Sequence, residues 1–422
     1  MSGETKSVVV LTAEKPEHWE CMLLRGVLAY HGLHAEVHTH ENDAGIPGDA
    51  LVLLHITPRT SGWLSDRPGS RNRTQVLVGH LASVAYLHGE LAPGQNEILV
   101  YGEPYALVAR LAHEPGLLEH YRGSAVLGPL LEPRAYRAPS RASLEPGMRP
   151  ILTSLGCEKT CGYCSYGSTN ITLYGSSFKR RSRSSQQVSQ DLIAYMREGN
   201  EHFQLVANQF LSQEPGNNQE LYDLALHWDV QTDGRPTLAF TLSPSEVLQN
   251  RELLSSMSHA FRLYPRLSID SLDDDALGLL DLNFTMATAL ESLEFLANLR
   301  LPLRLNYLMI YPGLTLNSLT MQLARFLDIA RATGYLSARQ KLWLALDLFA
   351  GCLHVTPGTP LAQKPGISIG YEQDLPHSVL AVLSRAQRAI EVEMERLDTG
   401  DGHDPLLAVI NAGLEEATKW NP

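Results

Sequence analysis

Short apolar runs rich in β-branched residues alternate with helical patterns over residues 1–132, and this alternation constrains the fold more than any other feature. The pattern predicts helices at residues 21–30 and 104–113. It predicts strands at residues 7–12, 35–38, 50–56, 74–78 and 98–101. Strands that alternate with helices form right-handed βαβ units and an open parallel sheet. The sequence therefore predicts an α/β fold that begins with a doubly wound, Rossmann-like domain, with ligands at the carboxyl ends of its strands.

A proline-rich segment separates this first set of elements from a second one. Residues 133–150 carry four prolines and no apolar periodicity, which is typical of an interdomain linker. The second set contains predicted strands at 151–154, 203–207, 237–242, 266–269, 303–310 and 342–349, with helices at 185–197 and 244–257. Six parallel strands with crossover helices predict a partial (β/α)6 barrel of the TIM type over residues 151–365. Residues 366–422 are predicted to be helical, with one helix after Pro376 and a short one after Pro405.

Composition limits the class of protein. The 422-residue chain is 44% hydrophobic and 19% charged, as expected for an ordinary globular protein. No secretory signal pattern opens the chain, and no apolar stretch reaches the roughly 18 residues that a membrane span needs. We therefore expect a cytoplasmic protein without a membrane partner.

Charge bears on the partners. The formal net charge of −12 is unfavourable for binding a phosphate backbone, so no nucleic-acid partner is expected. The basic run at residues 179–183 is interpreted as a solvated or phosphate-binding loop rather than a nucleic-acid patch. The acidic excess weakly favours a neutral or cationic small-molecule substrate.

Three of the five cysteines lie within eight residues, in the stretch SLGCEKTCGYCSYGS. Cys157, Cys161 and Cys164 have the spacing C-x3-C-x2-C, whereas Cys21 and Cys352 are far away. An odd number of cysteines in a chain of this kind argues against a disulfide framework and favours metal or redox chemistry.

Two kinds of metal centre compete for these three thiols. Zinc prefers four tetrahedral ligands, and no histidine occurs between His120 and His202 to supply a nearby fourth one. An iron–sulfur cube takes one ligand per iron, so three cysteines would leave one iron open. The spacing favours a cluster, and zinc and three unliganded structural cysteines remain the alternatives.

The motif stands directly after the first predicted barrel strand, with Tyr163 immediately before its last cysteine, and it resembles the radical S-adenosylmethionine (radical SAM) superfamily. The resemblance implies a [4Fe–4S] cluster on Cys157, Cys161 and Cys164, with S-adenosylmethionine chelated at the fourth iron. Reductive cleavage of S-adenosylmethionine would release methionine and a 5′-deoxyadenosyl radical that abstracts hydrogen from the substrate. The resemblance also implies a flavodoxin or ferredoxin-type electron donor.

Later segments resemble the barrel of the same superfamily. These are FQLVANQF (203–210), TLSPSE (241–246), LSIDSLDDDAL (267–277), LMIYPGLT (308–315) and HVTPGTPL (354–361). By resemblance, the residues expected to contact S-adenosylmethionine are Tyr163, Asn208, Gln209, Ser243, Asp270, Ser271 and Tyr311. Taken alone, each polar strand-end residue is explained at least as well by a helix cap or a turn.

The first 132 residues resemble the cobalamin-binding domain that many radical SAM enzymes carry. The segments that carry this resemblance are LLRGVLAYHGLHAEV (23–37), HITPRTSG (55–62), VLVGHLAS (76–83) and YGEPYALVARL (101–111), and the residues expected to line the cleft are Thr57, Gly79, His80, Gly102 and Glu103. Two features depart from the pattern. Relatives commonly have two glycines where this chain has Gly79-His80, and the D-x-H-x-x-G motif is absent, since the nearest string, residues 401–406, lacks the glycine. Cobalamin therefore stays open as a third cofactor, and the alternative is a domain that only helps to enclose substrate.

Three functions fit these features. The first is a cobalamin-independent radical SAM enzyme that carries out epimerisation, dehydration or rearrangement of a sugar-like or aminoglycoside-like small molecule, with Cys352 as a hydrogen donor unless it is simply a buried inert thiol. The second is a cobalamin-dependent radical SAM C-methyltransferase. The third is a non-enzymatic metal or redox-sensing module with a closed coordination shell. The identity of the substrate depends on loops whose geometry the sequence does not give.

Overall fold

The computed structural model describes most of the chain and divides it into two compact units. The described residues are 8–12, 19–39, 46, 50–57, 74–136, 148–212, 215–228, 235–353, 355, 359–368, 375–397 and 404–420. The first unit comprises residues 1–158 and 165–208, and the second comprises residues 159–164 and 209–422. Some predicted features lie outside the described residues: residues 13–15 and 58–62 at two strand ends, 137–147 of the linker, parts of 354–358, and residues 401–403.

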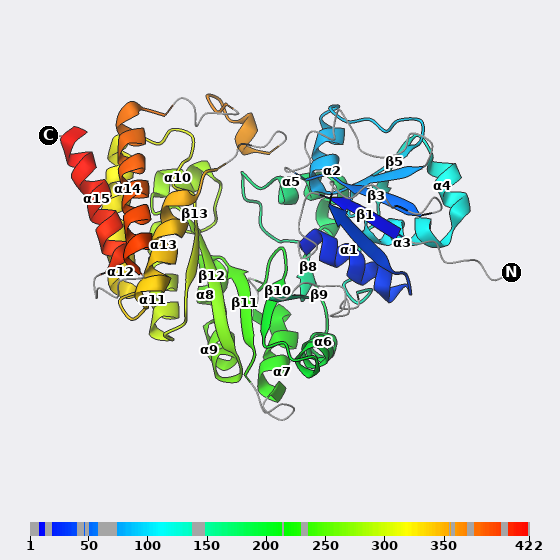
Figure 1. Cartoon of the computed structure of the whole chain (residues 1–422), viewed down its shortest axis with the longest axis horizontal. Coiled ribbons are helices and arrows are strands. Elements are labelled where there is room, and N and C mark those ends of the chain that lie inside the picture. Colours follow the sequence, from blue (N-terminus) through cyan, green and yellow to red (C-terminus); the bar gives the residue numbers. More distant parts are fainter. Residues whose placement is uncertain are drawn as a thin grey trace. The chain divides into compact units, whose positions relative to one another are not determined.

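A six-stranded parallel sheet forms the centre of the first unit (Figure 1), with the strand order β2-β1-β3-β4-β5-β6. Its strands are β1 (Val8–Thr12), β2 (Ala35–Thr39), β3 (Leu51–His55), β4 (Gln75–Val78), β5 (Glu97–Gly102) and β6 (Ser124–Gly128). The order reverses at β1, since β2 lies on one side of it and β3 on the other, and ligands of such sheets bind beside this switch point. The prediction of a doubly wound, Rossmann-like domain is therefore confirmed, although β6 was not predicted.

Both faces of this sheet are buried, which explains why its strands are almost continuously apolar. Alternate residues of β1 face opposite sides, so Val8 and Val10 belong to one core cluster and Val9 and Leu11 to another. The first cluster includes residues of α1 (Trp19–Tyr30), α3 (Tyr105–His113) and α4 (Pro115–Tyr121), and the second includes residues of α2 (His80–Leu87). Complete burial of each such Val or Leu side chain stabilises the fold by roughly 1.5–3 kcal/mol.

The first unit also holds the elements around the cysteine segment. These are β7 (Arg149–Leu152), β8 (Ser154–Leu155), α5 (Ser165–Tyr174), η4 (Gly175–Ser177), β9 (Arg181–Ser182), α6 (Ser185–Arg197) and β10 (His202–Val206). Strands β7 and β10 pair in parallel, with Ile151 opposite Leu205, whereas β8 and β9 are antiparallel. Helix α6 occupies the predicted residues because a capping box of Ser184 and Gln187 satisfies its first amides.

Three further parallel strands, β11 (Thr237–Leu242), β12 (Arg262–Asp270) and β13 (Arg304–Tyr307), lie in the second unit. With β7 and β10 they make up a second parallel sheet of five strands. The intervening elements are η5 (Pro215–Asn218), α7 (Gln219–Trp228), α8 (Pro244–Gln249), α9 (Arg251–Ala260), α10 (Asp274–Leu279) and α11 (Met286–Asn298). The α/β class and the parallel strands of the barrel are thereby confirmed.

The predicted sixth strand at residues 342–349 is wrong, because these residues belong to the helix α13 (Ala338–Ala350). The stretch LWLALDLF alternates like a strand, but its apolar residues also fall at helical spacing, with Leu342, Ala345 and Phe349 buried along one side. A capping box of Ser337 and Gln340 starts the helix. Among the described residues the sixth position of the barrel is marked only by a parallel bridge between Ile310 and Cys352.

The helix predicted at residues 244–257 is divided into α8 and α9 at Asn250. The side chain of Asn250 donates to the carbonyl oxygens of Ser212 and Glu246, at 3.0 and 2.9 Å. A buried asparagine that bonds to the backbone in this way competes with the helical hydrogen-bond pattern, so the helix restarts there.

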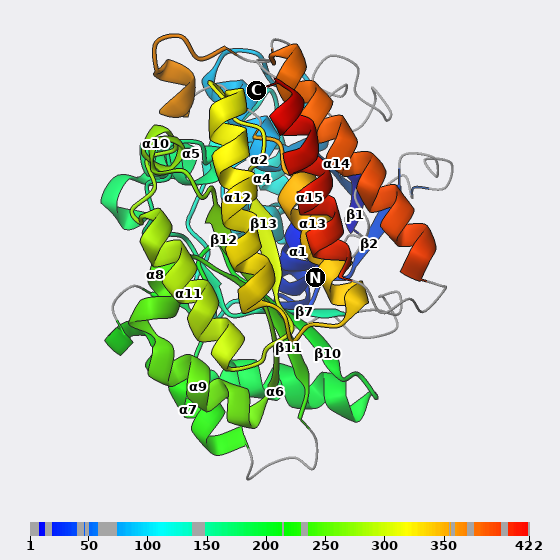
Figure 2. The same cartoon turned by 90° about the vertical axis from the view of Figure 1, so that its left-hand side faces the viewer.

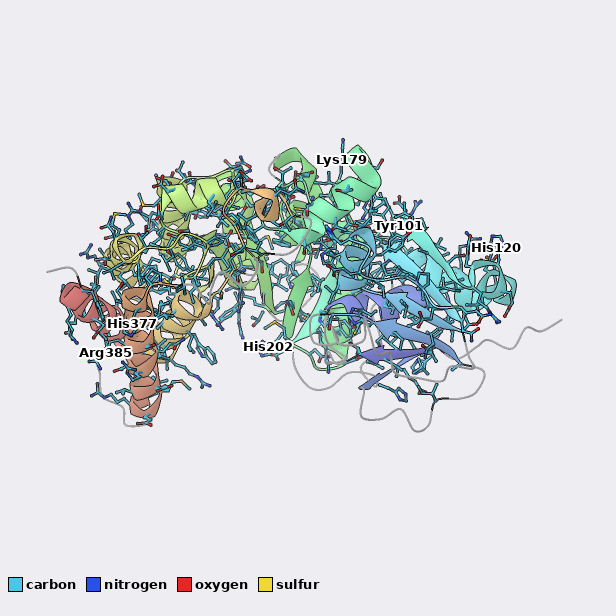
Figure 3. All side chains as sticks on the ribbon, turned by 90° about the horizontal axis from the view of Figure 1, so that it is seen from above. Tyr101, His120, Lys179, His202, His377 and Arg385 are labelled. Carbon is cyan, nitrogen blue, oxygen red and sulfur yellow. The ribbon has the colours of Figure 1, made fainter. Side chains whose placement is uncertain are left out.

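Four helices pack together at the C-terminal end of the second unit (Figure 2). They are α12 (Leu316–Ala332), α13, α14 (His377–Arg396) and α15 (Pro405–Trp420), followed along the chain in yellow to red. Figure 3 labels His377 and Arg385 on α14, and the ring of His377 lies 5.5 Å from that of Trp420 on α15. The predicted C-terminal helices are confirmed, and the second is longer than expected. Among the helices of the described residues, none combines the length and the apolarity that crossing a membrane requires.

Candidate active site

The cysteine segment follows β8, and β8 comes directly after β7, the first strand of the second parallel sheet, so the segment has its predicted place along the chain. Cys157 belongs to the first unit, whereas Cys161 and Cys164 belong to the second. All three are partly exposed, and none is in a disulfide. No three Cys, His, Asp or Glu side chains of the described residues are grouped closely enough to hold a metal ion. The donor set suits an iron–sulfur cluster, whose binding would itself draw the thiolates together, and the ligand set stays a prediction.

The middle of the cysteine segment is fixed to the second unit through the backbone of Gly162. Its N–H donates to the carbonyl of Leu280 at 2.8 Å, and its carbonyl accepts from the N–H of Leu361 at 2.9 Å. A Cβ at this position would lie 2.5 Å from a carboxylate oxygen of Asp281. Any larger residue between Cys161 and Tyr163 would therefore have to displace the Asp281 side chain and crowd the Leu280 carbonyl.

Tyr163 and Asp270, both predicted to contact S-adenosylmethionine, lie together in the second unit. The Tyr163 hydroxyl donates to Asp270 Oδ2 at 3.2 Å. Burial raises the pKa of Asp270 to about 6. Burial also raises the pKa of Tyr163 well above its usual value, and the negative charges of Asp270, Cys161 and Cys164 raise it further. Tyr163 therefore remains a hydrogen-bond donor throughout the neutral pH range.

The backbone of Asp270 is strained. This residue ends β12 with φ of +51°, in the left-handed region that residues other than glycine adopt only at an energetic cost, which is smallest for Asn and Asp. The register of β12 against β13 shifts between Ser268 and Asp270. Strain of this kind persists only where the surrounding structure enforces it, and it is common at functional sites.

Ser243, the predicted contact at the end of β11, is bonded to a buried glutamate. Its N–H and its hydroxyl donate to Glu246 Oε2, at 2.8 and 2.7 Å, and Ser243 is the N-cap of α8. The alternative of a helix cap is thus confirmed for Ser243. The same carboxylate accepts from the N–H of Leu211 at 3.0 Å and forms an ion pair with Lys159 of the cysteine segment.

Ser271 and Tyr311 take part in a buried polar network behind the end of β12. The Tyr311 hydroxyl donates to Asp273 at 3.1 Å and accepts from Gln322 at 3.3 Å. The Ser271 hydroxyl accepts from the N–H of Asp273 at 3.2 Å. The N-cap of α10 is Asp273, not Asp270 or Ser271. The network makes this strand end rigid, because each member is held by others.

The predicted residues after β10 support the backbone on either side of them. Asn208 Oδ1 accepts from the N–H of Gly156 at 3.0 Å, next to Cys157. Gln209 is buried and donates to the carbonyl of Leu211 at 2.8 Å. Asn208 and Gln209, both predicted to contact S-adenosylmethionine, therefore follow a strand end. Their hydrogen bonds are made to the protein backbone and stabilise this part of the chain.

The carboxyl edge of the six-stranded sheet contains the residues predicted for a cobalamin cleft. Thr57 is buried. Gly79 has φ of +113°, and a Cβ there would lie 2.5 Å from the carbonyl oxygen of Ile56. His80 forms a 2.8 Å hydrogen bond with the Ser165 hydroxyl of α5, and its ring lies 5.5 Å from that of Tyr166.

Tyr174, at the end of α5, fills the space beside Gly102. With φ of +80°, Gly102 would place a Cβ 2.1 Å from the Tyr174 hydroxyl oxygen. This hydroxyl donates to the carbonyl of Gly128 at 2.5 Å and accepts from the N–H of Glu103 at 2.7 Å. Glycine is required at position 102 because Tyr174 occupies the space that a Cβ would need.

Glu103, the last residue predicted for the cleft, is buried in an ion pair. Arg181 Nη2 donates to its Oε1 at 2.5 Å, and the N–H of Leu131 donates to its Oε2 at 2.7 Å. Burial raises the pKa of Glu103, and the Arg181 charge opposes this shift. Arg181 and Arg183 of the predicted basic loop are thus turned inward, Arg183 to Asp191, whereas Lys179 is exposed and projects outward (Figure 3).

Cys352 lies in the bridge with Ile310 and is partly exposed. Its Sγ is 3.8 Å from the carbonyl oxygen of Leu353. The thiol is therefore not fully buried, and both of its expected roles, inert thiol and hydrogen donor, stay predictions.

Sequence reasoning missed Lys159, Glu246, Tyr174 and Arg181. Only Glu246 had a signal, because Ser243-x-x-Glu246 has the spacing of a capping box. That spacing predicts the bond to Ser243 but not the ion pair with Lys159, which depends on tertiary structure.

Comparison with known proteins gives structural relatives without sequence relatives. No family model matches the chain. No curated protein matches it in sequence.

Solved structures with the same fold include OxsB, described as a cobalamin-dependent S-adenosylmethionine radical enzyme, with aqua-cobalamin and S-adenosylmethionine bound. The TM-score is 0.62 at 12% identity, covering 96% of this chain and 72% of that one. The radical S-adenosylmethionine methyltransferase TsrM from Kitasatospora setae, with cobalamin and a [4Fe–4S] cluster bound, gives 0.58 at 14% identity, covering 77% and 73%. TsrM with tryptophan substrate and a SAM analog gives 0.57 at 14%, covering 77% and 71%. At these identities the likeness establishes the fold, and the predicted resemblance is confirmed at that level.

Proposed function

We propose that the chain is a radical SAM enzyme, with Cys157, Cys161 and Cys164 as ligands of a [4Fe–4S] cluster that binds S-adenosylmethionine. When bound, this pair supplies methionine and a hydrogen-abstracting 5′-deoxyadenosyl radical on one-electron reduction. One observation carries the proposal: C-x3-C-x2-C follows the first strand of a parallel sheet in a fold shared with OxsB and TsrM. A flavodoxin or ferredoxin-type protein is the proposed electron donor.

The chain's own residues would hold S-adenosylmethionine at strand ends that are already rigid. Asp270 is strained and buried, and it is positioned by the protonated hydroxyl of Tyr163. Ser243 and Tyr311 are fixed by Glu246 and Asp273. Side chains fixed by such hydrogen bonds keep a binding surface in place before the ligand arrives, which lowers the ordering cost of binding.

We propose that the reaction proceeds without cobalamin and is an epimerisation, dehydration or rearrangement of a sugar-like or aminoglycoside-like small molecule. Support for cobalamin independence comes from the first unit. At its sheet edge the Tyr174 hydroxyl lies beside Gly102 and His80 is hydrogen-bonded to Ser165, so the chain's own side chains take up the space at these two positions. The net charge of −12 favours a cationic amino-sugar substrate over an anionic one. Cys352 is the proposed hydrogen donor.

A second candidate is a cobalamin-dependent radical SAM C-methyltransferase. It is favoured by the compared structures, since OxsB is described as cobalamin-dependent and TsrM as a methyltransferase with cobalamin bound. The two candidates share the cluster and S-adenosylmethionine and differ in the use of the first unit.

The proposal is tested by anaerobic reconstitution with iron and sulfide, followed by reduction with dithionite in the presence of S-adenosylmethionine. We expect 5′-deoxyadenosine and methionine in equal amounts. Cys157→Ala, Cys161→Ala and Cys164→Ala should each abolish both products, whereas Cys21→Ala, outside the triplet, should retain them. A filled cluster without any cleavage of S-adenosylmethionine would instead favour a metal or redox-sensing module.

Cobalamin use is tested by incubating the reconstituted protein with hydroxocobalamin and then removing unbound corrin by gel filtration. We expect the corrin absorbance to be lost from the protein fraction. Stoichiometric retention, together with a product heavier by one methyl group, would establish the methyltransferase instead.

A further inference from the structure

We propose that Lys159 and Glu246 form a clamp that positions the cysteine segment, and that both are positioning residues for the radical chemistry. This inference rests on the proposed function, because it assigns a task to the segment that would hold the cluster. Lys159 lies two residues after Cys157 and two before Cys161. Its ammonium group is paired with the carboxylate of Glu246 in the same unit.

Glu246 is anchored independently of Lys159. Its side chain is 1% exposed, and it accepts three hydrogen bonds, from the N–H and hydroxyl of Ser243 and from the N–H of Leu211. Ser243 and Leu211 are far apart along the chain, and one carboxylate joins them within the second unit. Lys159 thereby ties the cysteine segment to a fixed point rather than to a freely moving side chain.

The clamp acts on a different part of the segment from the attachments of Gly162 and Tyr163 described above. The backbone of Gly162 bonds to Leu280 and Leu361, and Tyr163 bonds to Asp270. These contacts fix the stretch from Cys161 to Cys164. The Lys159 pair acts on the preceding spacer of three residues, which joins Cys157 to Cys161.

An ion pair suits this task because its partner is buried. A carboxylate removed from water is stabilised by a cation and by hydrogen bonds, and both are present at Glu246. The Lys159 side chain is only 17% exposed, so solvent weakens the attraction less than in a surface pair. Removal of the ammonium should loosen the attachment of the spacer while Glu246 keeps its three other hydrogen bonds.

The inference is tested with Lys159→Met, Lys159→Arg and Glu246→Gln. Lys341→Met is the matched control, because Lys341 and Asp404 form another partly buried ion pair in the same unit, with side-chain exposures of 12% and 24%. The first measurement uses the apoprotein and needs no activity. It is the alkylation rate of Cys161 and Cys164 by iodoacetamide, followed by mass spectrometry, with Cys352 as the internal reference.

Lys159→Met and Glu246→Gln should each raise the alkylation rate of Cys161 relative to Cys352 by about fivefold or more, as expected when a segment opens locally. Lys159→Arg keeps the charge and should remain near the wild-type rate, as should Lys341→Met. In the reconstituted enzyme, Lys159→Met should bind iron but show a higher KM for S-adenosylmethionine and a changed electron paramagnetic resonance (EPR) spectrum. These readouts separate positioning from a general loss of stability, which would change Cys352 as well.

A Lys159→Met protein with wild-type alkylation rates and a wild-type KM would overturn the clamp and leave the radical function standing. Conversely, wild-type protein that assembles no cluster would refute the proposed function, while the alkylation rates would still decide whether the clamp exists.

Discussion

At the scale of single residues, Asp270 is a carboxyl group placed where ionisation is unfavourable. The residue is 6% exposed, its φ is +51°, and burial raises its pKa to about 6. The unfolded chain ionises this group near pH 4, whereas the folded chain holds the proton to higher pH. Folding stability from Asp270 is therefore fully present below about pH 4 and is lost as the pH rises through 6.

Asp270→Asn should remove this pH dependence while preserving the backbone, because asparagine also tolerates the left-handed conformation. Relative to wild type, the apoprotein variant should gain stability between pH 4 and pH 7, by an amount on the order of 2 kcal/mol. Urea unfolding of both proteins at the two pH values measures this difference, with the exposed Asp275→Asn as control. An equal stability difference at both pH values would show that Asp270 does not titrate as described.

At the scale of elements, the sequence predicts the bounds of some strands and the polar residues at their ends, but not the partners of those residues. Strand β11 falls on its predicted residues because a β-branched and aromatic run is bounded by Pro236 and Pro244. Residues 342–349 were mispredicted because period 2 and period 3.6 both fit eight apolar-rich residues, and tertiary packing on one side selected the helix. The polar strand ends were identified correctly as candidates, but their partners, such as Glu246 and Tyr174, come from segments far away in sequence.

The contact of α5 with β5 gives a prediction at the same scale. Gly102→Ala would force a Cβ to within 2.1 Å of the Tyr174 hydroxyl at φ of +80°, so Tyr174 must move and lose its hydrogen bonds. We expect a loss of about 3 kcal/mol, from the left-handed strain and the broken bonds. Gly32→Ala, at φ of +75° with no atom within 4 Å, should cost only about 1 kcal/mol. Thermal or urea unfolding measures both.

Tyr174→Phe in the Gly102→Ala background provides the check on this explanation. Removing the hydroxyl takes away the nearest clashing atom, so part of the lost stability should return. If Gly102→Ala and Gly32→Ala lowered the free energy of unfolding by the same amount, Tyr174 would not occupy the space beside Gly102. A cofactor would then have room there.

At the scale of the whole molecule, the sequence predicts the order of the two parallel α/β sheets and the location of the cysteine motif after the first strand of the second. These predictions rest on patterns within short windows, which local physics controls. The ion pairs of Lys159 with Glu246 and of Arg181 with Glu103 were not predictable, since they join residues 87 and 78 positions apart. The same holds for the contacts of Tyr174 and His80 at the sheet edge of the first unit, which support the proposal of cobalamin independence.

The proposed function requires that three cysteines bind a [4Fe–4S] cluster whose fourth iron is left for S-adenosylmethionine. The most direct measurement is the EPR spectrum of the anaerobically reconstituted, reduced protein, recorded before and after S-adenosylmethionine is added. We predict a [4Fe–4S]⁺ signal whose g values shift on addition, because the ligand coordinates the open iron. Zinc in place of iron, or a cluster signal that S-adenosylmethionine leaves unchanged, would contradict the claim.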